Sequence, residues 1–350
     1  MKYVYLTFLL IAFPLALNSQ SFTGTVRNAK TQESLPNVNV YYSGSSTGTI
    51  TDFDGNFVLP ALEHDQKIIV YSLMGFETLT MSNPMNSSIG VIELTESIGE
   101  LPAVYLDPDP WSREKKEAYF KEQFLGNTAV ADRCEILNME DIRLQFIPSI
   151  DKMVAYCPVP IKVVNKDLGY LVHLELSEFE ISFRKVDLKK LPEEIATNPR
   201  IEKRTHVMES SLYVATTYFE ELKEKRPGMR KRKRHRKRAF KRSDVKFFQT
   251  IIADEFAEAN YKLYHKGKPV KYDKQIRVVP KEGYYEVIFR EMSYQVVDGE
   301  GYQSNIQIDN HRLYITKFGT VMNYRDFRWG GFISRLKVSG MLPLEYVPNP

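Results

Sequence analysis

Cysteine is scarce in this sequence, since only Cys134 and Cys157 among 350 residues carry a thiol. Two cysteines exclude a disulfide-dense scaffold, and their spacing lacks the CxxC pairs of a zinc or redox site. In an oxidising compartment the two thiols could form one disulfide, which would stabilise the fold by about 3 kcal/mol. Two separate buried thiols are the alternative, and the sequence leaves both open.

Long apolar runs are absent after the first residues. A basic start at Lys2 is followed by the apolar stretch Val4 to Leu17 and by a cleavage site at Leu17-Asn18-Ser19. This pattern is typical of a secretory signal peptide, so we predict residues 1–19 to be one and the chain to be exported, in the periplasm or at the outer membrane. An uncleaved anchor is the alternative. The stretch is shorter than the roughly 20 residues of a membrane-spanning helix, and Pro14 interrupts it.

Positive charge is concentrated in one segment. Residues 223–242 contain 13 Lys or Arg and one Glu, a charge of +12, whereas the whole chain carries +4, which leaves −8 for the rest. We expect this dense run of like charges to repel itself and to form a solvated loop or arm. The segment is predicted to bind an anionic surface, either lipid headgroups or lipopolysaccharide. The candidate residues are Arg230, Lys231, Arg232, Lys233, Arg234, Arg236, Lys237 and Arg238.

Two alternatives for this basic segment stay open. Nucleic acid is a weaker candidate partner, because Phe240 is the single aromatic residue of the segment and platforms on which bases could stack are lacking. A surface insertion without a dedicated partner would also explain the composition.

Short strand-like runs, each bounded by turn residues, fill the region that follows the predicted signal peptide. Seven runs in so short a region predict a β-sandwich over residues 21–96. Asp54-Gly55 is a good hairpin turn between two of the runs, because glycine accepts a positive φ without steric cost. The predicted strands are Phe22–Arg27, Val38–Tyr42, Gly48–Thr51, Asn56–Leu59, Lys67–Ser72, Phe76–Met81 and Val91–Leu94.

Four sequence blocks in this region carry a family resemblance. In order along the chain they read GTV from Gly24, LPNVNV from Leu35, GTITDFDGNF from Gly48 and YSLMGF from Tyr71. Together they resemble the carboxypeptidase regulatory-like domain of Bacteroidetes envelope proteins, which include TonB-dependent receptors. The resemblance implies a prealbumin-like seven-stranded sandwich without catalytic residues. Phe76 departs from the Tyr that is usual in the family.

One polar cluster in the sandwich region raises the question of calcium. Asp52, Asp54 and Asn56 alternate as they do at the start of an EF-hand loop. The later oxygen ligands and the bidentate Glu of such a loop are missing. We therefore interpret the cluster as the polar tip of a hairpin.

The rest of the chain predicts a different organisation. We expect a linker over residues 97–110, ending in the rigid Asp107-Pro108-Asp109-Pro110, and then an α+β region over residues 111–350 that is rich in antiparallel strands. A helix is predicted from Trp111 to Phe124, with Pro110 at its first position and Gly126 ending it. A second helix is predicted after Ser243, with Phe256 on its apolar face. The predicted strands are Ile142–Phe146, Met153–Cys157, Ile161–Val164, Tyr170–Leu176, Phe179–Phe183, Tyr284–Val296, Gln303–Ile308, Arg312–Phe318 and Phe332–Val338.

This region, too, resembles a known group of proteins. The blocks DPWS from Asp109, FLG from Phe124, CEILN from Cys134, LGY from Leu168 and LPLEY from Leu342 are similar to those of full-length Bacteroidetes carboxypeptidase-like regulatory domain-containing proteins. The resemblance implies an envelope protein without an assigned reaction.

A zinc peptidase is the enzyme class that the sequence most readily allows. His206 and Glu209 have the H-x-x-E spacing of a metal-binding pair, and His311 is a candidate third ligand. Against this, the region lacks the alternating strands and helices of an α/β catalytic domain. No phosphate-binding loop, dinucleotide fingerprint or nucleophile elbow is present. The sequence predicts no cofactor.

The sequence therefore favours a non-enzymatic accessory or interaction protein of the cell envelope that binds a protein or glycan partner through its β-sandwich. Two alternatives are kept. One is a zinc carboxypeptidase-like hydrolase using His206, Glu209 and His311. The other is an outer-membrane β-barrel component, for which the expected alternation of apolar and polar positions is not evident.

Overall fold

A computed structural model describes residues 21–62, 68–82, 88–97, 107–185, 206–223 and 226–348 of the protein. The predicted signal peptide lies outside the described residues, as does most of the predicted linker. Strands dominate this part of the chain, and the buried side chains form three hydrophobic clusters. The prediction of a mainly β chain is confirmed. None of the helices described here has the length and apolar character that crossing a membrane requires.

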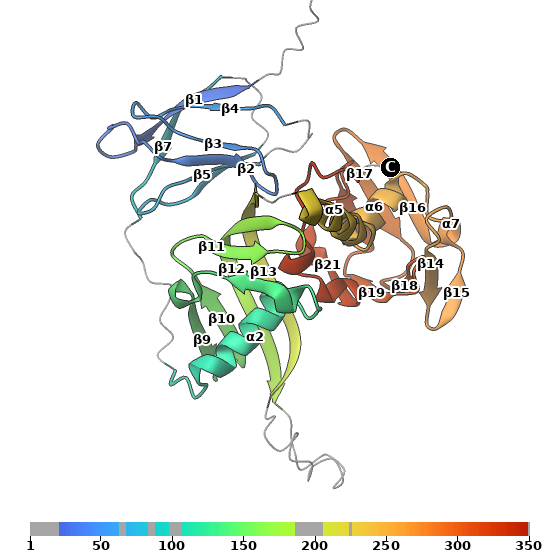
Figure 1. Ribbon diagram of the computed structural model, residues 1–350. Coiled ribbons are helices and arrows are strands. Elements are labelled where there is room, and N and C mark those ends of the chain that lie inside the picture. The colour runs from blue at the N-terminus through green and yellow to red at the C-terminus, as the bar shows by residue number, and fades with distance from the viewer. Residues whose placement is uncertain are drawn as a thin grey trace, which may run out of the picture.

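The first cluster lies between two small sheets (Figure 1). One sheet has the order β4-β1-β7 and the other β3-β2-β5-β6. In β4 the buried side chains alternate with exposed ones, as the sequence period of two predicts. All seven predicted strands of the sandwich are present. They are β1 (Phe22–Asn28), β2 (Asn39–Tyr42), β3 (Gly48–Ile50), β4 (Asn56–Leu59), β5 (Ile68–Ser72), β6 (Leu79–Ser82) and β7 (Ser88–Leu94).

The second cluster lies beneath helix α2 (Arg113–Leu125). The helix begins after Ser112, whose side chain accepts a hydrogen bond from Lys115 N, so the prediction that Pro110 opens it is wrong. Trp111 lies before the helix, and its ring stacks on Phe146, with centroids 3.8 Å apart. Gly126 ends the helix as predicted, with a φ of 105°.

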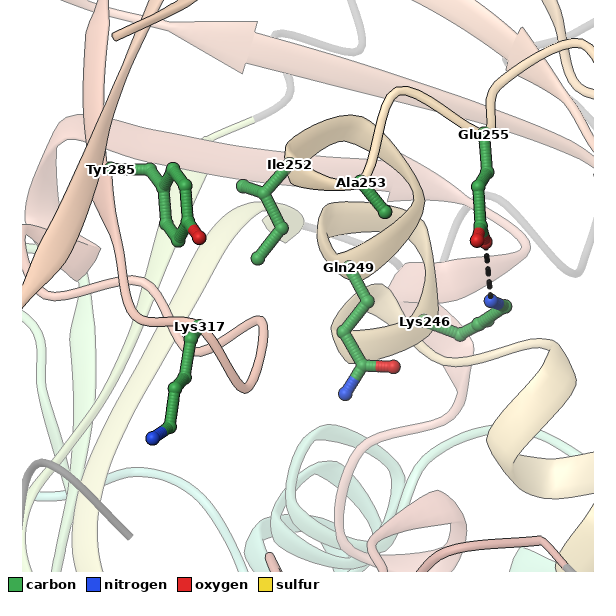
Figure 2. A pocket seen from close by; sticks show the side chains of 7 residues that line it. All are labelled: Lys246, Gln249, Ile252, Ala253, Glu255, Tyr285 and Lys317. Atoms are coloured by element: carbon green, nitrogen blue, oxygen red, sulfur yellow. Dashed lines mark ion pairs between the residues drawn. The ribbon is translucent and has the colours of Figure 1, made fainter. Parts of the chain in front are cut away.

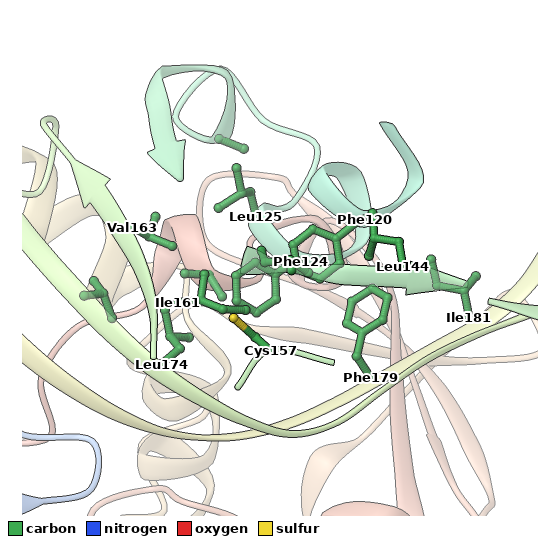
Figure 3. Packing of buried hydrophobic residues seen from close by; sticks show 14 of the residues in the cluster. Phe120, Phe124, Leu125, Leu144, Cys157, Ile161, Val163, Leu174, Phe179 and Ile181 are labelled. Carbon is green, nitrogen blue, oxygen red and sulfur yellow. The ribbon is translucent and has the colours of Figure 1, made fainter. Parts of the chain in front are cut away.

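A six-stranded antiparallel sheet covers the other side of this cluster. Phe120 and Phe124 of α2 meet Phe179 of the sheet there (Figure 3). The two strands predicted at Tyr170–Leu176 and Phe179–Phe183 form one strand, β12, whose pairing with β13 is irregular between Leu176 and Glu178. The sheet consists of β8 (Cys134–Ile136), β9 (Arg143–Ile147), β10 (Lys152–Tyr156), β11 (Ile161–Asn165), β12 (Tyr170–Lys185) and β13 (His206–Glu221).

The third cluster belongs to residues 244–331 and was not predicted as a separate core. Helix α6 (Asp244–Ile252) is capped by Ser243 as expected, but it ends before Phe256. The helix packs on a five-stranded sheet, β15-β14-β18-β19-β21, and a three-stranded sheet, β16-β17-β20. The strands are β14 (Lys262–His265), β15 (Lys268–Val270), β16 (Ile276–Lys281), β17 (Tyr284–Phe289), β18 (Ser293–Val297), β19 (Gln303–Ile308), β20 (Arg312–Ile315) and β21 (Phe327–Gly331).

Two strand predictions in this part are wrong. The single strand expected over Tyr284–Val296 is interrupted at residues 290–292 and gives β17 in the three-stranded sheet and β18 in the five-stranded sheet. The strand expected at Phe332–Val338 is replaced by two 3₁₀ turns, Ile333–Arg335 and Val338–Gly340. Its apolar residues do not form a ladder because the chain leaves the sheet at Gly331, where φ is 73°.

The β2–β3 turn joins the sandwich to the six-stranded sheet. Gly44 N donates to Thr217 O at 2.6 Å, and Phe219 N donates to Ser45 O at 2.9 Å, so the turn pairs with the outer edge of β13. On its other side Gly44 O accepts a hydrogen bond from Leu344 N at 2.8 Å. The turn is therefore held between an edge strand and the segment 343–346.

A side-chain contact supports this docking. The Tyr41 hydroxyl lies 3.3 Å from Glu175 and 3.4 Å from Thr216, both in the six-stranded sheet. Burial and the nearby Glu175 carboxylate raise the pKa of Tyr41 well above its ordinary value. The hydroxyl is therefore fixed as a neutral hydrogen-bonding group at neutral pH.

Candidate anion-binding surface

The basic segment forms a helix, α5 (Arg226–Lys241), so the prediction of a solvated loop or arm is wrong. The helix lies against the C-terminal part of the chain (Figure 1). Its partly buried residues recur at intervals of three and four, which places them on one helical face. They are Arg232, His235, Arg236, Ala239 and Phe240. The like charges are tolerated because this inner face meets carbonyl oxygens, carboxylates and rings.

Arg236 is the most completely engaged cation of the inner face. Its Nε donates to Leu168 O at 2.6 Å, and its Nη2 lies 2.7 Å from Glu221 Oε1. The guanidinium also lies 4.1 Å above the ring centre of Tyr170. The planar, five-donor guanidinium can make all of these contacts at once, which an ammonium cannot do.

Three further residues of the inner side hold the helix. Arg232 Nη1 donates to Leu222 O at 2.7 Å, and its aliphatic part covers Gly169, where a Cβ would come within 2.4 Å of it. His235 lies 3.8 Å from Asp167. At the end of the helix Arg242 Nε donates to Glu300 Oε2 at 2.9 Å, and its guanidinium lies 4.3 Å above the Tyr302 ring. The predicted site residues Arg232 and Arg236 therefore serve the fold and face away from solvent.

The remaining six predicted site residues share the exposed face of α5, which we call the outer basic face. They are Arg230, Lys231, Lys233, Arg234, Lys237 and Arg238. The nine residues from 230 to 238 span about 12 Å of helix, so each of the six cations lies within roughly one Debye length of its neighbours on the face at physiological salt. Such a density attracts polyanions and makes their binding strongly dependent on salt.

Replacing an arginine by methionine should affect stability differently on the inner and the outer face of α5. Arg236→Met removes the charged hydrogen bonds to Leu168 and Glu221, and we expect a loss of about 1.5–3 kcal/mol in the free energy of unfolding. Arg238→Met, two residues later on the outer basic face, should change it by less than about 0.5 kcal/mol. Urea unfolding of both variants measures the difference. Equal losses would show that the two faces are not distinct.

A cavity of about 290 Å³ lies beside the helix. Its walls are mainly apolar and come from α5, from the segment 128–133 and from the 3₁₀ turns near the C-terminus. Arg238 belongs both to this wall and to the outer basic face. Arg133, which also lines the cavity, is paired with Asp167.

A second hollow of about 320 Å³ lies between α6, β17 and the segment after β20 (Figure 2). Lys246 on its rim lies 3.9 Å from Glu255, and Gln249 Nε2 donates to Phe318 O at 2.9 Å. Lys317 lies 5.0 Å from the centre of the Phe318 ring. These polar side chains already serve the fold, and the hollow is open to solvent.

The three residues considered for zinc are not brought together. His206 lies against the rings of Trp111 and Phe183, whereas Glu209, at an irregularity in the pairing of β13 with β12, lies beside Arg184. His206 lies 3.4 Å from Asp151, and burial lowers its pKa, whereas Glu209 pairs with Arg184 at 3.1 Å. His311 lies just before β20, a strand of another sheet, and its Nδ1 is 3.1 Å from Phe289 O. Within the described ranges no three His, Cys, Asp or Glu residues are grouped as metal ligands would be.

Cys134 and Cys157 are both free thiols in the structure, with Cys157 buried and Cys134 half-buried. Cys134 pairs with Asn165 at the end of β11, whereas Cys157 precedes the start of that strand at Ile161. The two cysteines thus lie towards opposite ends of β11. This strand spans roughly 13 Å, which is more than the Cα separation that a disulfide allows. Burial raises the pKa of Cys134 to about 12 and that of Cys157 above its ordinary value, so neither thiol is activated.

Comparison with known proteins identifies the sandwich. Residues 22–106 match the family described as CarboxypepD_reg-like domain. The match confirms the resemblance that the four sequence blocks indicated.

Two curated relatives match the same part of the chain. TonB-dependent receptor P39 of Formosa agariphila is 37% identical over 99 residues, which cover 25% of this chain and 9% of the receptor. TonB-dependent receptor SusC of Bacteroides thetaiotaomicron is 36% identical over 74 residues, which cover 21% of this chain and 7% of the receptor. The matched stretch is thus less than a tenth of either receptor.

Proposed function

We propose that this chain is an exported, non-enzymatic protein of the cell envelope that binds a protein or glycan partner through its β-sandwich. The proposal includes cleavage of residues 1–19 and a division into the sandwich at 21–96, a linker at 97–110 and the α+β region at 111–350. The outer basic face would meet an anionic surface, lipid headgroups or lipopolysaccharide. The match to parts of two TonB-dependent receptors supports the envelope as the compartment.

The observation that carries the binding role is the exposure of one end of the sandwich. The β2–β3 turn docks the other end on the six-stranded sheet. The β3–β4 and β5–β6 turns lie at the other end of the strands from the β2–β3 turn, with Phe53 90% exposed and Met74 82% exposed, while Thr78 beside β6 donates to Glu175. Two large apolar side chains exposed at one end of the sandwich offer apolar surface to a partner. We call these two residues the sandwich tip.

In vivo crosslinking combined with cell fractionation tests this proposal. A photo-crosslinking residue at position 53 or 74 should give a discrete adduct in the envelope fraction. The same residue at Met292, a 45% exposed apolar position in the C-terminal part, should not. A version lacking residues 229–242 should keep the adduct and lose part of its envelope association. Recovery of the chain in the cytosol, or equal adducts at 53 and 292, would contradict the proposal.

A further inference from the structure

We propose that the cavity beside α5 binds the apolar chain of an anionic amphiphile whose headgroup is held by Arg238. This inference deepens the proposed contact between the outer basic face and an anionic lipid surface, and it rests on that contact for the source of the ligand. The surface contact itself needs only charge. The cavity adds a site for one molecule.

The chemistry of the walls argues for an apolar chain. Val130, Leu168, Ala239, Phe332 and Leu336 contribute to the mainly apolar lining. The volume of about 290 Å³ is close to the lower limit of roughly 300 Å³ for small-molecule pockets. A hollow of this size suits a single unbranched chain and is too small for a bulky polycyclic ligand. An apolar chain is also favoured by the hydrophobic effect, which rewards each methylene that leaves water.

The charges at the cavity argue for an anionic headgroup. Asp167 is the one carboxylate of the wall, and Arg133 pairs with it, while His235 lies 3.8 Å from it. Arg242 also lines the wall and is paired with Glu300, which lies outside it. Arg238 is exposed, and no ion pair or hydrogen bond joins it to another residue in the described ranges. Its guanidinium is therefore free to bind a phosphate or carboxylate with two parallel hydrogen bonds.

The position of the cavity connects it to the outer basic face. Arg238 belongs to both, so a headgroup bound there would lie level with the cations of Arg234 and Lys237 on the same helix. An amphiphile that leaves an anionic layer would place its headgroup at this face and its chain in the cavity. The arrangement would convert a salt-sensitive electrostatic contact into one that also buries apolar surface.

Isothermal titration with soluble alkyl phosphates, from butyl to decyl and below micelle-forming concentrations, tests the site. Binding to the full chain should tighten about fourfold for each added methylene until the cavity is filled, and then level off. Arg238→Gln should weaken every member of the series by about tenfold. Lys231→Gln, on the outer basic face but away from the cavity, is the matched control and should leave the series unchanged. Alkyl alcohols of the same lengths should bind more weakly than the phosphates.

A cavity-filling variant gives an independent readout. Ala239→Leu should abolish the dependence on chain length while vesicle binding through the outer basic face stays unchanged. If this variant is misfolded by circular dichroism, the comparison of Arg238→Gln with Lys231→Gln still decides. Affinity that is independent of chain length in the unaltered protein, or equal effects of Arg238→Gln and Lys231→Gln, would overturn the inference. If the unaltered protein binds alkyl phosphates but does not bind anionic vesicles, the result contradicts the proposed surface contact and leaves the cavity site standing.

Discussion

Replacing the six cations of the outer basic face with Gln should abolish binding of the protein to anionic lipid vesicles. Each Lys or Arg near such a surface contributes about 1 kcal/mol, so the loss is expected to reach about 10⁴-fold in affinity. The residues are Arg230, Lys231, Lys233, Arg234, Lys237 and Arg238. Co-sedimentation with vesicles that contain an anionic phospholipid measures the effect, and the unaltered protein should lose affinity steeply as salt is raised.

Substitutions on the inner face of the same helix provide the control for this result. Arg232→Gln and Arg236→Gln remove two cations of the inner face, whose contacts are with Leu222, Leu168 and Glu221. This double variant should unfold more easily but, below its unfolding transition, should retain nearly all vesicle binding. Vesicle binding that survives all six outer substitutions would show that the surface contact lies elsewhere.

Removal of Phe120 should cause the largest single loss of stability. Its side chain is fully buried and stacks on Phe124 at 4.9 Å and against Phe179 at 4.8 Å between ring centroids. Phe120→Ala is therefore expected to lower the free energy of unfolding by about 3–5 kcal/mol, because transfer to water and a residual cavity both contribute. Chemical denaturation followed by tryptophan fluorescence suits the measurement, since Trp111 belongs to the same cluster.

A matched phenylalanine on the surface provides the reference. Phe53 is 90% exposed at the sandwich tip, and Phe53→Ala should change the free energy of unfolding by less than about 0.5 kcal/mol. A small loss for Phe120→Ala would mean that α2 does not pack on the six-stranded sheet as described. A large loss for Phe53→Ala would argue that the tip is a structural element.

The sandwich was predictable because its strands obey local rules. Each run is short, is bounded by turn residues and contains alternating or continuous apolar residues, and Gly55 occupies a turn with a φ of 76°. A Cβ at Gly55 would come within 2.4 Å of Val26 O, so glycine is required by both φ and space. Local pattern and tertiary packing agree in this part of the chain, and the predicted strand boundaries are close to the observed ones.

β13 was missed because its pattern is weak. It is an edge strand whose residues are mostly polar or half-buried, so its alternation does not stand out in the sequence. Its partner β12 is buried along much of one side and was predicted, although as two strands. β13 is a strand because it pairs with β12, and no local pattern in the sequence indicates this long-range pairing.

The basic segment shows how tertiary contacts override a compositional rule. Like charges disfavour an isolated helix, and on that ground a loop was predicted. The prediction did not take into account that Arg236 donates hydrogen bonds to Leu168 O and Glu221, or that Arg242 donates to Glu300. The spacing of Arg232, Arg236 and Ala239 at four and three residues was the available signal for a helix with an inner face.

Amide hydrogen exchange of residues 229–241 tests the division of α5 into an inner and an outer face most directly. A helix docked through Arg232 and Arg236 predicts slow exchange across these residues in the unaltered protein and fast exchange after Arg236→Met, with Arg238→Met leaving it slow. Exchange at the rate of an unstructured peptide in the unaltered protein would contradict the account.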